Sequence, residues 1–174
     1  MNKKKMPDEK IEKLIDALFN KDGKIRQTSR QELVKIGRPA IMYLMKVLKK
    51  STIDQARWEA AKALADMEDD GVILPLVAAL EDTFPDVQWL AAEGLKKYKM
   101  KAWAPLLKLL VKDGGSSVLL RQGVHHVFLK QMEAGYDDLI AALLKALETV
   151  TAPELRLSAA NEILKRLKMK PANA

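Results

Sequence analysis

The 174-residue sequence predicts an all-α fold, a right-handed superhelical solenoid of about ten helices. One pattern recurs five times, with 31, 31, 33 and 35 residues between successive key positions. These key positions are Arg26, Arg57, Gln88, Arg121 and Arg156. Apolar or small residues stand one residue before, three after and seven after each of them, which is close to the helical period. No stretch alternates as a strand would, so each repeat is predicted to be a helical pair that stacks on its neighbours.

The first helix of each repeat is predicted to be amphipathic. The seventh residue after the key position is always apolar: Leu33, Leu64, Leu95, Phe128 and Ile163. Alanine pairs occupy the third and fourth positions after the key residue in three repeats: Ala60 and Ala61, Ala91 and Ala92, Ala159 and Ala160. Such small side chains let a neighbouring helix approach closely.

A second helix is predicted in each of the first four repeats. Its buried columns are Ile41, Ile73, Trp103 and Ile140, then Leu44, Leu76, Leu106 and Leu143, then Leu48, Leu80, Leu110 and Leu147. The two helices of a pair are joined by residues that end one helix and start the next: Gly37-Arg38-Pro39, Asp69-Asp70-Gly71 and Gly135-Tyr136-Asp137-Asp138.

The two ends of the array are predicted to be half-repeats with charged outer faces. Residues 7–20 resemble a lone second helix, and residues 153–168 a lone first helix. We therefore expect four helical pairs with two capping helices in a single repeat domain, residues 8–168. A disordered basic N-terminus, residues 1–7, and a C-terminal tail, residues 169–174, are expected to flank it.

The third repeat resembles the HEAT repeat family, especially the short phycobilisome lyase-type repeats. The run begins at Asp82 and continues through Pro85-Asp86-Val87-Gln88, Ala91-Ala92, Leu95 and Pro105-Leu106-Leu107. The second repeat is nearly as similar, while Arg30 and His125 replace the second small residue in the first and fourth. The resemblance covers about residues 8–168 and implies an all-α solenoid. It does not imply one activity, because this fold occurs in scaffolds, adaptors, lyase subunits and DNA glycosylases.

The composition indicates a protein of the cytoplasm without disulfides. The apolar share is 48%, the aromatic share is 5%, and there is no cysteine. The basic opening Lys3-Lys4-Lys5 is followed by Pro7-Asp8-Glu9-Lys10 instead of the apolar run of a signal peptide. We expect no membrane association, since no stretch approaches the ~20 apolar residues of a membrane span.

The charge of the chain favours an acidic partner only weakly. The net charge is +7, but it is unevenly distributed. Residues 1–50 carry 14 basic and 6 acidic side chains, residues 51–100 carry 5 and 10, and residues 101–174 carry 11 and 7. The acidic middle interrupts a basic stripe along the chain, so binding of nucleic acid is less expected than binding of a protein or peptide.

The arginines at the key positions are interpreted as a structural ladder. Arg26, Arg57, Arg121 and Arg156 suit multidentate pairing with an acid or a loop carbonyl of the same or the next repeat. Three acids precede the column: Asp22, Asp54 and Asp86. The alternative is a row that binds a ligand, but Gln88 shows that charge is not required there.

Five lysines and two tryptophans are the candidate partner-binding residues. The lysines follow the buried leucines of the second helices and are expected to face solvent: Lys46, Lys50, Lys108, Lys112 and Lys145. They form either a basic ridge on a concave face or a simple solvated surface. Trp58 and Trp89 occupy equivalent positions in adjacent repeats, where they either bind a flat ligand or protein hot spot or pack between repeats.

No pattern predicts catalysis, a metal or a cofactor. His125 and His126 are the only histidines, and adjacent helical positions point about 100° apart, so they are expected to be structural. Asp69, Asp70, Asp137 and Asp138 are expected to cap helices. The sequence therefore predicts a non-catalytic scaffold or adaptor that binds a protein or peptide. The alternatives are a nucleic-acid-binding, DNA glycosylase-like protein, with Trp58, Trp89, Asp54 and Asp86 as its candidate residues, and a lyase-like enzyme subunit.

Overall fold

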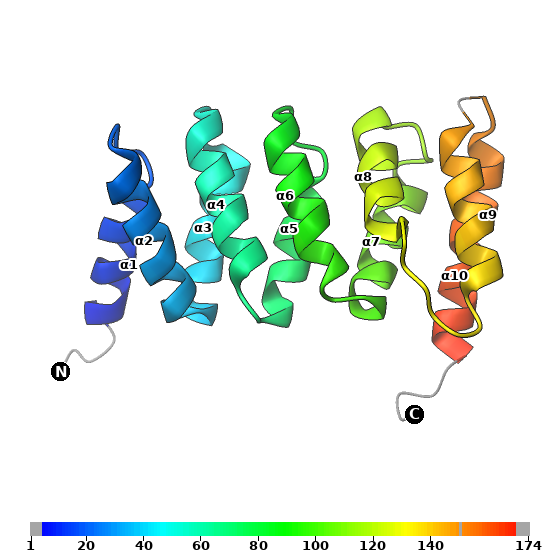
Figure 1. Ribbon diagram of the computed structural model, residues 1–174, viewed down its shortest axis with the longest axis horizontal. Coiled ribbons are helices and arrows are strands. Elements are labelled where there is room, and N and C mark those ends of the chain that lie inside the picture. The colour runs from blue at the N-terminus through cyan, green and yellow to red at the C-terminus, as the bar shows by residue number, and fades with distance from the viewer. Residues whose placement is uncertain (1–4, 150, 170–174) are drawn as a thin grey trace. The chain divides into compact units, whose positions relative to one another are not determined.

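The computed structural model describes residues 5–149 and 151–169, and this part of the chain contains ten α-helices, one short 3-10 helix and no strand (Figure 1). The predicted all-α class and helix count are thereby confirmed. The single repeat domain expected for residues 8–168 stays a prediction. The chain divides into two compact units between Gly94 and Leu95. Unit 1 ends at Gly94 and unit 2 begins at Leu95; each is described by itself below.

The helices follow the predicted order of cap, pairs and cap. They are α1 (Lys5–Ala17), α2 (Gly23–Ile36), α3 (Arg38–Lys50), α4 (Asp54–Asp66), η1 (Asp70–Val72), α5 (Ile73–Ala79), α6 (Pro85–Lys96), α7 (Met100–Lys112), α8 (Val118–Phe128), α9 (Asp137–Glu148) and α10 (Pro153–Met169). Of the expected disordered N-terminus, residues 5–7 form the first turn of α1 and residues 1–4 lie outside the described residues. Of the expected C-terminal tail, Met169 ends α10 and residues 170–174 lie outside them as well.

Unit 1 has two layers of helices. The second-type helices α1, α3 and α5 contact one another in order, and the first-type helices α2 and α4 pack on them and on each other (Figure 1). The predicted columns form the core between the layers, where these leucines are fully buried: Leu33, Leu44, Leu64 and Leu76.

Small residues permit the close packing of α6 on α4 and α5 within unit 1. Ala60, Ala61 and Ala91 are completely buried. A Cβ atom built on Gly94 of α6 would lie 2.9 Å from the Cβ atom of Ala65 and 2.9 Å from Cδ1 of Leu76. The helices therefore approach more closely here than any larger side chain would allow.

The turns within unit 1 follow the predicted chemistry. Gly37 ends α2 with a φ of 70°, a left-handed conformation that favours glycine, and Pro39 lies in the first turn of α3. Asp69 caps η1 by accepting a hydrogen bond of 2.8 Å from the Gly71 amide.

Unit 2 contains α7 to α10. The predicted C-terminal capping helix, α10, packs against α7 and α9, while α9 packs against α8. The connection between α8 and α9, residues 129–136, is long and places Tyr136 against Trp103 of α7, with ring centroids 5.6 Å apart. Trp103, which also packs on Phe128 at 5.2 Å, is 1% exposed. The three rings form a buried aromatic cluster in the core of unit 2.

Candidate functional site

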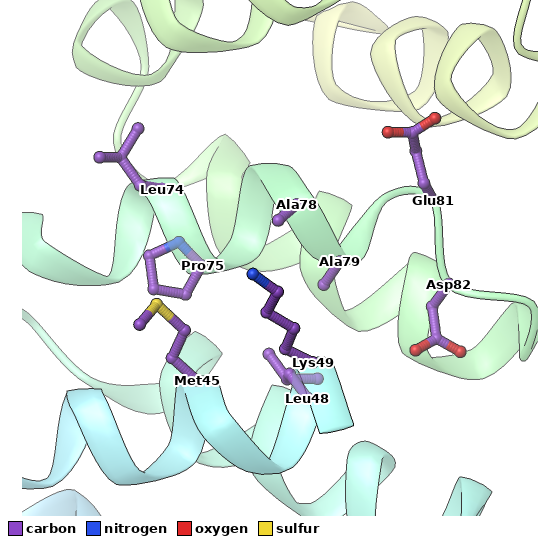
Figure 2. A pocket seen from close by; sticks show the side chains of 9 residues that line it. All are labelled: Met45, Leu48, Lys49, Leu74, Pro75, Ala78, Ala79, Glu81 and Asp82. Carbon is purple, nitrogen blue, oxygen red and sulfur yellow. The ribbon is translucent and has the colours of Figure 1, made fainter. Parts of the chain in front are cut away.

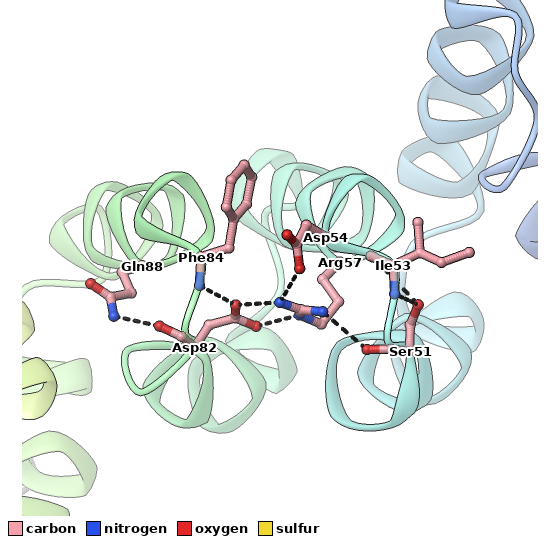
Figure 3. A network of polar contacts seen from close by, with 7 residues as sticks. All are labelled: Ser51, Ile53, Asp54, Arg57, Asp82, Phe84 and Gln88. Atoms are coloured by element: carbon pink, nitrogen blue, oxygen red, sulfur yellow. Dashed lines mark hydrogen bonds and ion pairs between the residues drawn. The ribbon is translucent and has the colours of Figure 1, made fainter.

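The best-defined polar feature of unit 1 is the network around Arg57 (Figure 3). Arg57, at the N-terminal end of α4, is only 7% exposed. Its Nε and Nη2 atoms donate to the two carboxylate oxygens of Asp82, at 2.7 and 2.9 Å. It also donates to Asp54 Oδ1 at 2.8 Å and to the Ser51 carbonyl at 3.1 Å. The hydrogen bonding of Arg57 to Asp82 is the main cause that raises the pKa of Arg57 above its ordinary value. This guanidinium therefore remains charged and holds the loop after α5 against α4.

Arg26 makes a comparable set of contacts one repeat earlier. Its Nε atom donates to Glu59 Oε1 at 3.0 Å, and its Nη1 atom donates to the carbonyls of Asn20 and Lys21 at 2.8 and 3.0 Å. Arg30 also donates to Glu59, which is buried. Both Arg26 and Arg57 therefore meet a carboxylate that lies on a later element of the chain.

The remaining positions of the column have different surroundings. Gln88 donates to the Asp82 carbonyl, and Arg156 donates to the Thr149 carbonyl. Arg121 has no hydrogen-bond or ion-pair partner for its guanidinium in residues 5–149 and 151–169, and its Nε atom is buried.

Of the three acids predicted to belong to the ladder, only one reaches an arginine of the column. Asp54 pairs with Arg57, whereas Asp22 caps α2 by accepting from the Lys24 amide at 2.8 Å. Asp86 lies exposed in the first turn of α6. The sequence reasoning missed Glu59 and Asp82 as partners of the column, although Asp82 opens the run that resembles the HEAT family.

The candidate partner-binding residues differ in exposure. All five lysines are exposed: Lys46, Lys50, Lys108, Lys112 and Lys145. Trp89 is 57% exposed, whereas Trp58 is half-buried with the guanidinium carbon of Arg30 5.4 Å from its ring centroid. Among the described aromatic residues, these two indoles make no ring contact with each other.

An open, largely apolar groove lies between α3 and α5 in unit 1 (Figure 2). Its volume is about 420 Å³, and its lining residues are Met45, Leu48, Lys49, Leu74, Pro75, Ala78, Ala79, Glu81 and Asp82. Ala78 stands where other second helices carry Lys46, Lys108 or Lys145, so its small side chain leaves room for the groove. Leu74 at the rim is 68% exposed. The lining is largely apolar, with Lys49 on the α3 side and the two carboxylates after α5.

A second, more polar pocket lies between α8 and α9 in unit 2. Its volume is about 450 Å³, and it is lined by Val118, Arg121, Gln122, His125, His126, Leu147 and Glu148. His125 Nε2 lies 3.2 Å from Glu148 Oε1, and His126 Nε2 lies 3.1 Å from Lys96 Nζ.

The described ranges contain no cluster of three or more histidine, cysteine or acidic side chains that could hold a metal ion. In the same part of the chain, every helix is too short or too polar to cross a membrane.

Comparison with known proteins identifies the repeats. The family model for HEAT repeats matches residues 41–125, which run from α3 into α8. HEAT repeats generally mediate interactions between proteins. A comparison with curated proteins finds no match.

Proposed function

Because residues 41–125 belong to the HEAT repeat family, we propose that this chain is a non-catalytic protein-interaction module. Its binding site is the groove between α3 and α5, and its ligand is a short segment of a partner protein that inserts apolar side chains there. The observation that supports this most directly is the groove itself, an open and largely apolar site lined by the second helices of two HEAT units.

The apolar lining supplies the affinity in this proposal. Leu74 of α5 is 68% exposed, and Met45 and Leu48 of α3 are half-buried in the lining. Covering such side chains with apolar groups of a partner removes them from water, at roughly 25 cal/mol for each Å² buried. An exposed apolar groove of this kind is typical of a surface that binds another protein.

The walls of the groove are held in place before a partner arrives. Asp82 lines the groove and is fixed by both guanidinium contacts from Arg57. Pro75 and Ala79 belong to a helix whose other face is buried in the core. A preformed site lowers the ordering cost of binding and leaves more of the contact energy as affinity.

The charges at the rim indicate the composition of the segment. Lys46, Lys49 and Lys50 are exposed on the C-terminal half of α3. We therefore expect acidic side chains to flank the apolar residues of the partner on this side. Lys108 and Lys112 on α7 of unit 2 and the exposed Trp89 remain proposed contacts of the same partner. Lys145 on α9 is assigned to the solvated surface that the sequence left as the alternative. The absence of cysteine supports the cytoplasm as the compartment in which this chain meets its partner.

A photo-crosslinking residue at position 74 tests the groove directly. We expect it to link the chain to a protein in extracts of the native host, while the same residue at Ile25, an exposed apolar position on α2 outside the groove, should not link to it. Ala78→Glu, which places bulk and charge in the groove at an exposed position, should abolish the link at position 74. Equal crosslinking from both positions, or an unaffected link in the Ala78→Glu variant, would show that the groove is not the binding site.

The same experiment separates the other functions considered for this fold. A nucleic-acid-binding protein would be linked to nucleic acid, with an affinity that falls steeply as salt rises. A lyase-like subunit would give product with its partner present, and that product would be lost on substitution of one acidic residue. Either result would contradict the proposed protein-binding role.

A further inference from the structure

We propose that the pocket between α8 and α9 binds an oxyanion of the phosphate class, and that Arg121 is the residue that holds it. This site lies in unit 2 and is independent of the groove between α3 and α5. The proposal rests on how Arg121 differs from the equivalent arginines of unit 1.

The arginine column has a consistent pattern in unit 1. Arg26 and Arg57 each meet a carboxylate supplied by a later element, Glu59 and Asp82 respectively. Asp82 accepts two hydrogen bonds from Arg57 in parallel, the geometry in which a guanidinium binds a carboxylate or a phosphate most strongly. In unit 1 the protein therefore supplies its own oxyanion to both of these arginines.

Arg121 departs from this pattern. Within residues 5–149 and 151–169, no acceptor meets its guanidinium, although its Nε atom is shielded from solvent. A buried donor without an acceptor is unfavourable, since it has lost its hydrogen bonds to water. Glu148 is the acid on the opposite wall of the pocket, but it lies 3.2 Å from His125 Nε2 and forms no ion pair with Arg121. An external oxyanion in the pocket that Arg121 lines would give its Nη groups an acceptor, as Asp82 does for Nη2 of Arg57.

A second guanidinium adds positive charge behind the pocket. Arg156 is 3% exposed, and its Nε atom also has no acceptor within the described ranges. Burial first, and the nearby charge of Arg121 second, lower the pKa of Arg156. The two guanidinium groups thus repel each other in a poorly hydrated region, and a dianion compensates two positive charges better than a single carboxylate does.

The remaining lining suits a phosphate group that is attached to a larger molecule. Gln122 lines the pocket and offers an amide that can donate hydrogen bonds. The pocket volume of about 450 Å³ exceeds what one phosphate ion fills. The apolar side chains of Val118 and Leu147 can contact the group that carries the phosphate. Inorganic phosphate and a phosphorylated side chain both present a phosphate group to Arg121. Only the phosphorylated side chain also carries a group that can contact Val118 and Leu147.

Nuclear magnetic resonance of the arginine Nε–H groups tests the proposal without any substitution. Titration of the full chain with inorganic phosphate, at constant ionic strength set with sodium chloride, should shift the Arg121 Nε–H signal. The Arg57 signal should stay in place, because its partners are already supplied by the chain. A short phosphoserine peptide should bind more tightly than inorganic phosphate if the phosphate is presented by a protein, and less tightly if the ligand is the free ion.

Two variants complete the test. Arg121→Gln should weaken phosphate binding by on the order of tenfold or more. Lys165→Gln, which removes the same charge at an exposed position of α10 outside the pocket, should leave binding unchanged. An Arg121 signal that does not move with phosphate or with the phosphopeptide would overturn the proposal. So would acetate binding as tightly as phosphate, or equal losses of affinity in the two variants.

Discussion

Arg57 and Asp82, which are 25 residues apart in the sequence, form a two-pronged ion pair with donor–acceptor distances of 2.7 and 2.9 Å (Figure 3). The pair joins the start of α4 to the loop after α5, and both side chains are nearly buried. Asp82 also accepts a hydrogen bond of 2.9 Å from the Phe84 amide. One carboxylate therefore fixes an arginine, a loop and the wall of the α3–α5 groove together.

Removal of one partner of this pair should destabilise the protein strongly. Asp82→Ala leaves the buried Arg57 guanidinium with only Asp54 and the Ser51 carbonyl. A buried donor that loses its acceptor typically costs about 1–3 kcal/mol, and more when the donor is charged. Urea unfolding followed by circular dichroism measures this loss. Asp86→Asn, an exposed acid in the first turn of α6, is the matched control and should change the free energy of unfolding by less than about 0.5 kcal/mol. Similar values for the two variants would mean that the pair does not contribute to stability.

The helices and the core could be predicted from the sequence because they depend on local spacing. Within each first helix the apolar positions follow the helical period, and their last position is Leu33, Leu64 or Leu95. These three side chains are completely buried in the structure. Local spacing also identified the turns at Gly37 and Asp69.

The side-chain partners and the groove could not be predicted in the same way. Whether Arg57 meets Asp54, Asp82 or Asp86 depends on the path of the loop after α5, which periodicity does not determine. The sequence places Ala78 where the other second helices carry Lys46, Lys108 or Lys145. That a groove forms beside Ala78 depends on the spacing of α3 and α5, which the sequence pattern does not give. The packing of α10 on α7 likewise depends on the long connection that ends at Tyr136.

The close approach at Gly94 gives a second prediction. Gly94→Ala adds a methyl group 2.9 Å from the Ala65 Cβ atom and 3.1 Å from the Ala65 Cα atom, so the backbone of α4 or α6 must shift. Alanine favours a helix over glycine by about 1 kcal/mol, whereas overpacking costs about 1–3 kcal/mol. We expect a net loss of stability in thermal unfolding.

The matched control for Gly94 is Gly23→Ala at the start of α2. A Cβ atom there would lie 3.5 Å from Arg26 Nη2, which is an ordinary contact. This variant should be as stable as the natural protein or slightly more stable. A gain in stability for Gly94→Ala equal to that of the control would contradict the close packing of α6.

The ion pair between Arg38 and Asp69 should contribute stability that depends on pH. Arg38 donates to both oxygens of Asp69 at 2.9 and 3.1 Å. The hydrogen bond from Arg38 first, and the one from the Gly71 amide second, lower the pKa of Asp69 from its ordinary value of 3.8. Because the folded state favours the ionised carboxyl, this contribution is fully present above about pH 4 and disappears as the pH falls through the lowered pKa.

Asp69→Asn tests this dependence, since asparagine can still cap η1 but carries no charge. The variant should be less stable than the natural protein at pH 7, and the difference should shrink as the pH falls below 4. Chemical unfolding measured at several pH values provides the comparison. Asp16→Asn, at an exposed position of α1, serves as the control. A difference that is the same at pH 7 and pH 3 would show that the cap alone, and not the charge, stabilises the turn.

The lysines of unit 2 give the last prediction. Lys108 lies on α7 and Lys145 on α9, and α7 packs against α8 and α10, so the two lysines do not continue one row of adjacent second helices. If Lys108 contacts an acidic partner, Lys108→Glu should weaken binding about three- to fivefold, the effect of a surface charge pair worth roughly 1 kcal/mol. Lys145→Glu should then have little effect, although it makes the same change in net charge. The measurement is the affinity of each purified variant for the partner identified by crosslinking at position 74. Equal weakening by both variants would indicate that net charge alone attracts the partner, and no weakening by either would show that these lysines form only a solvated surface.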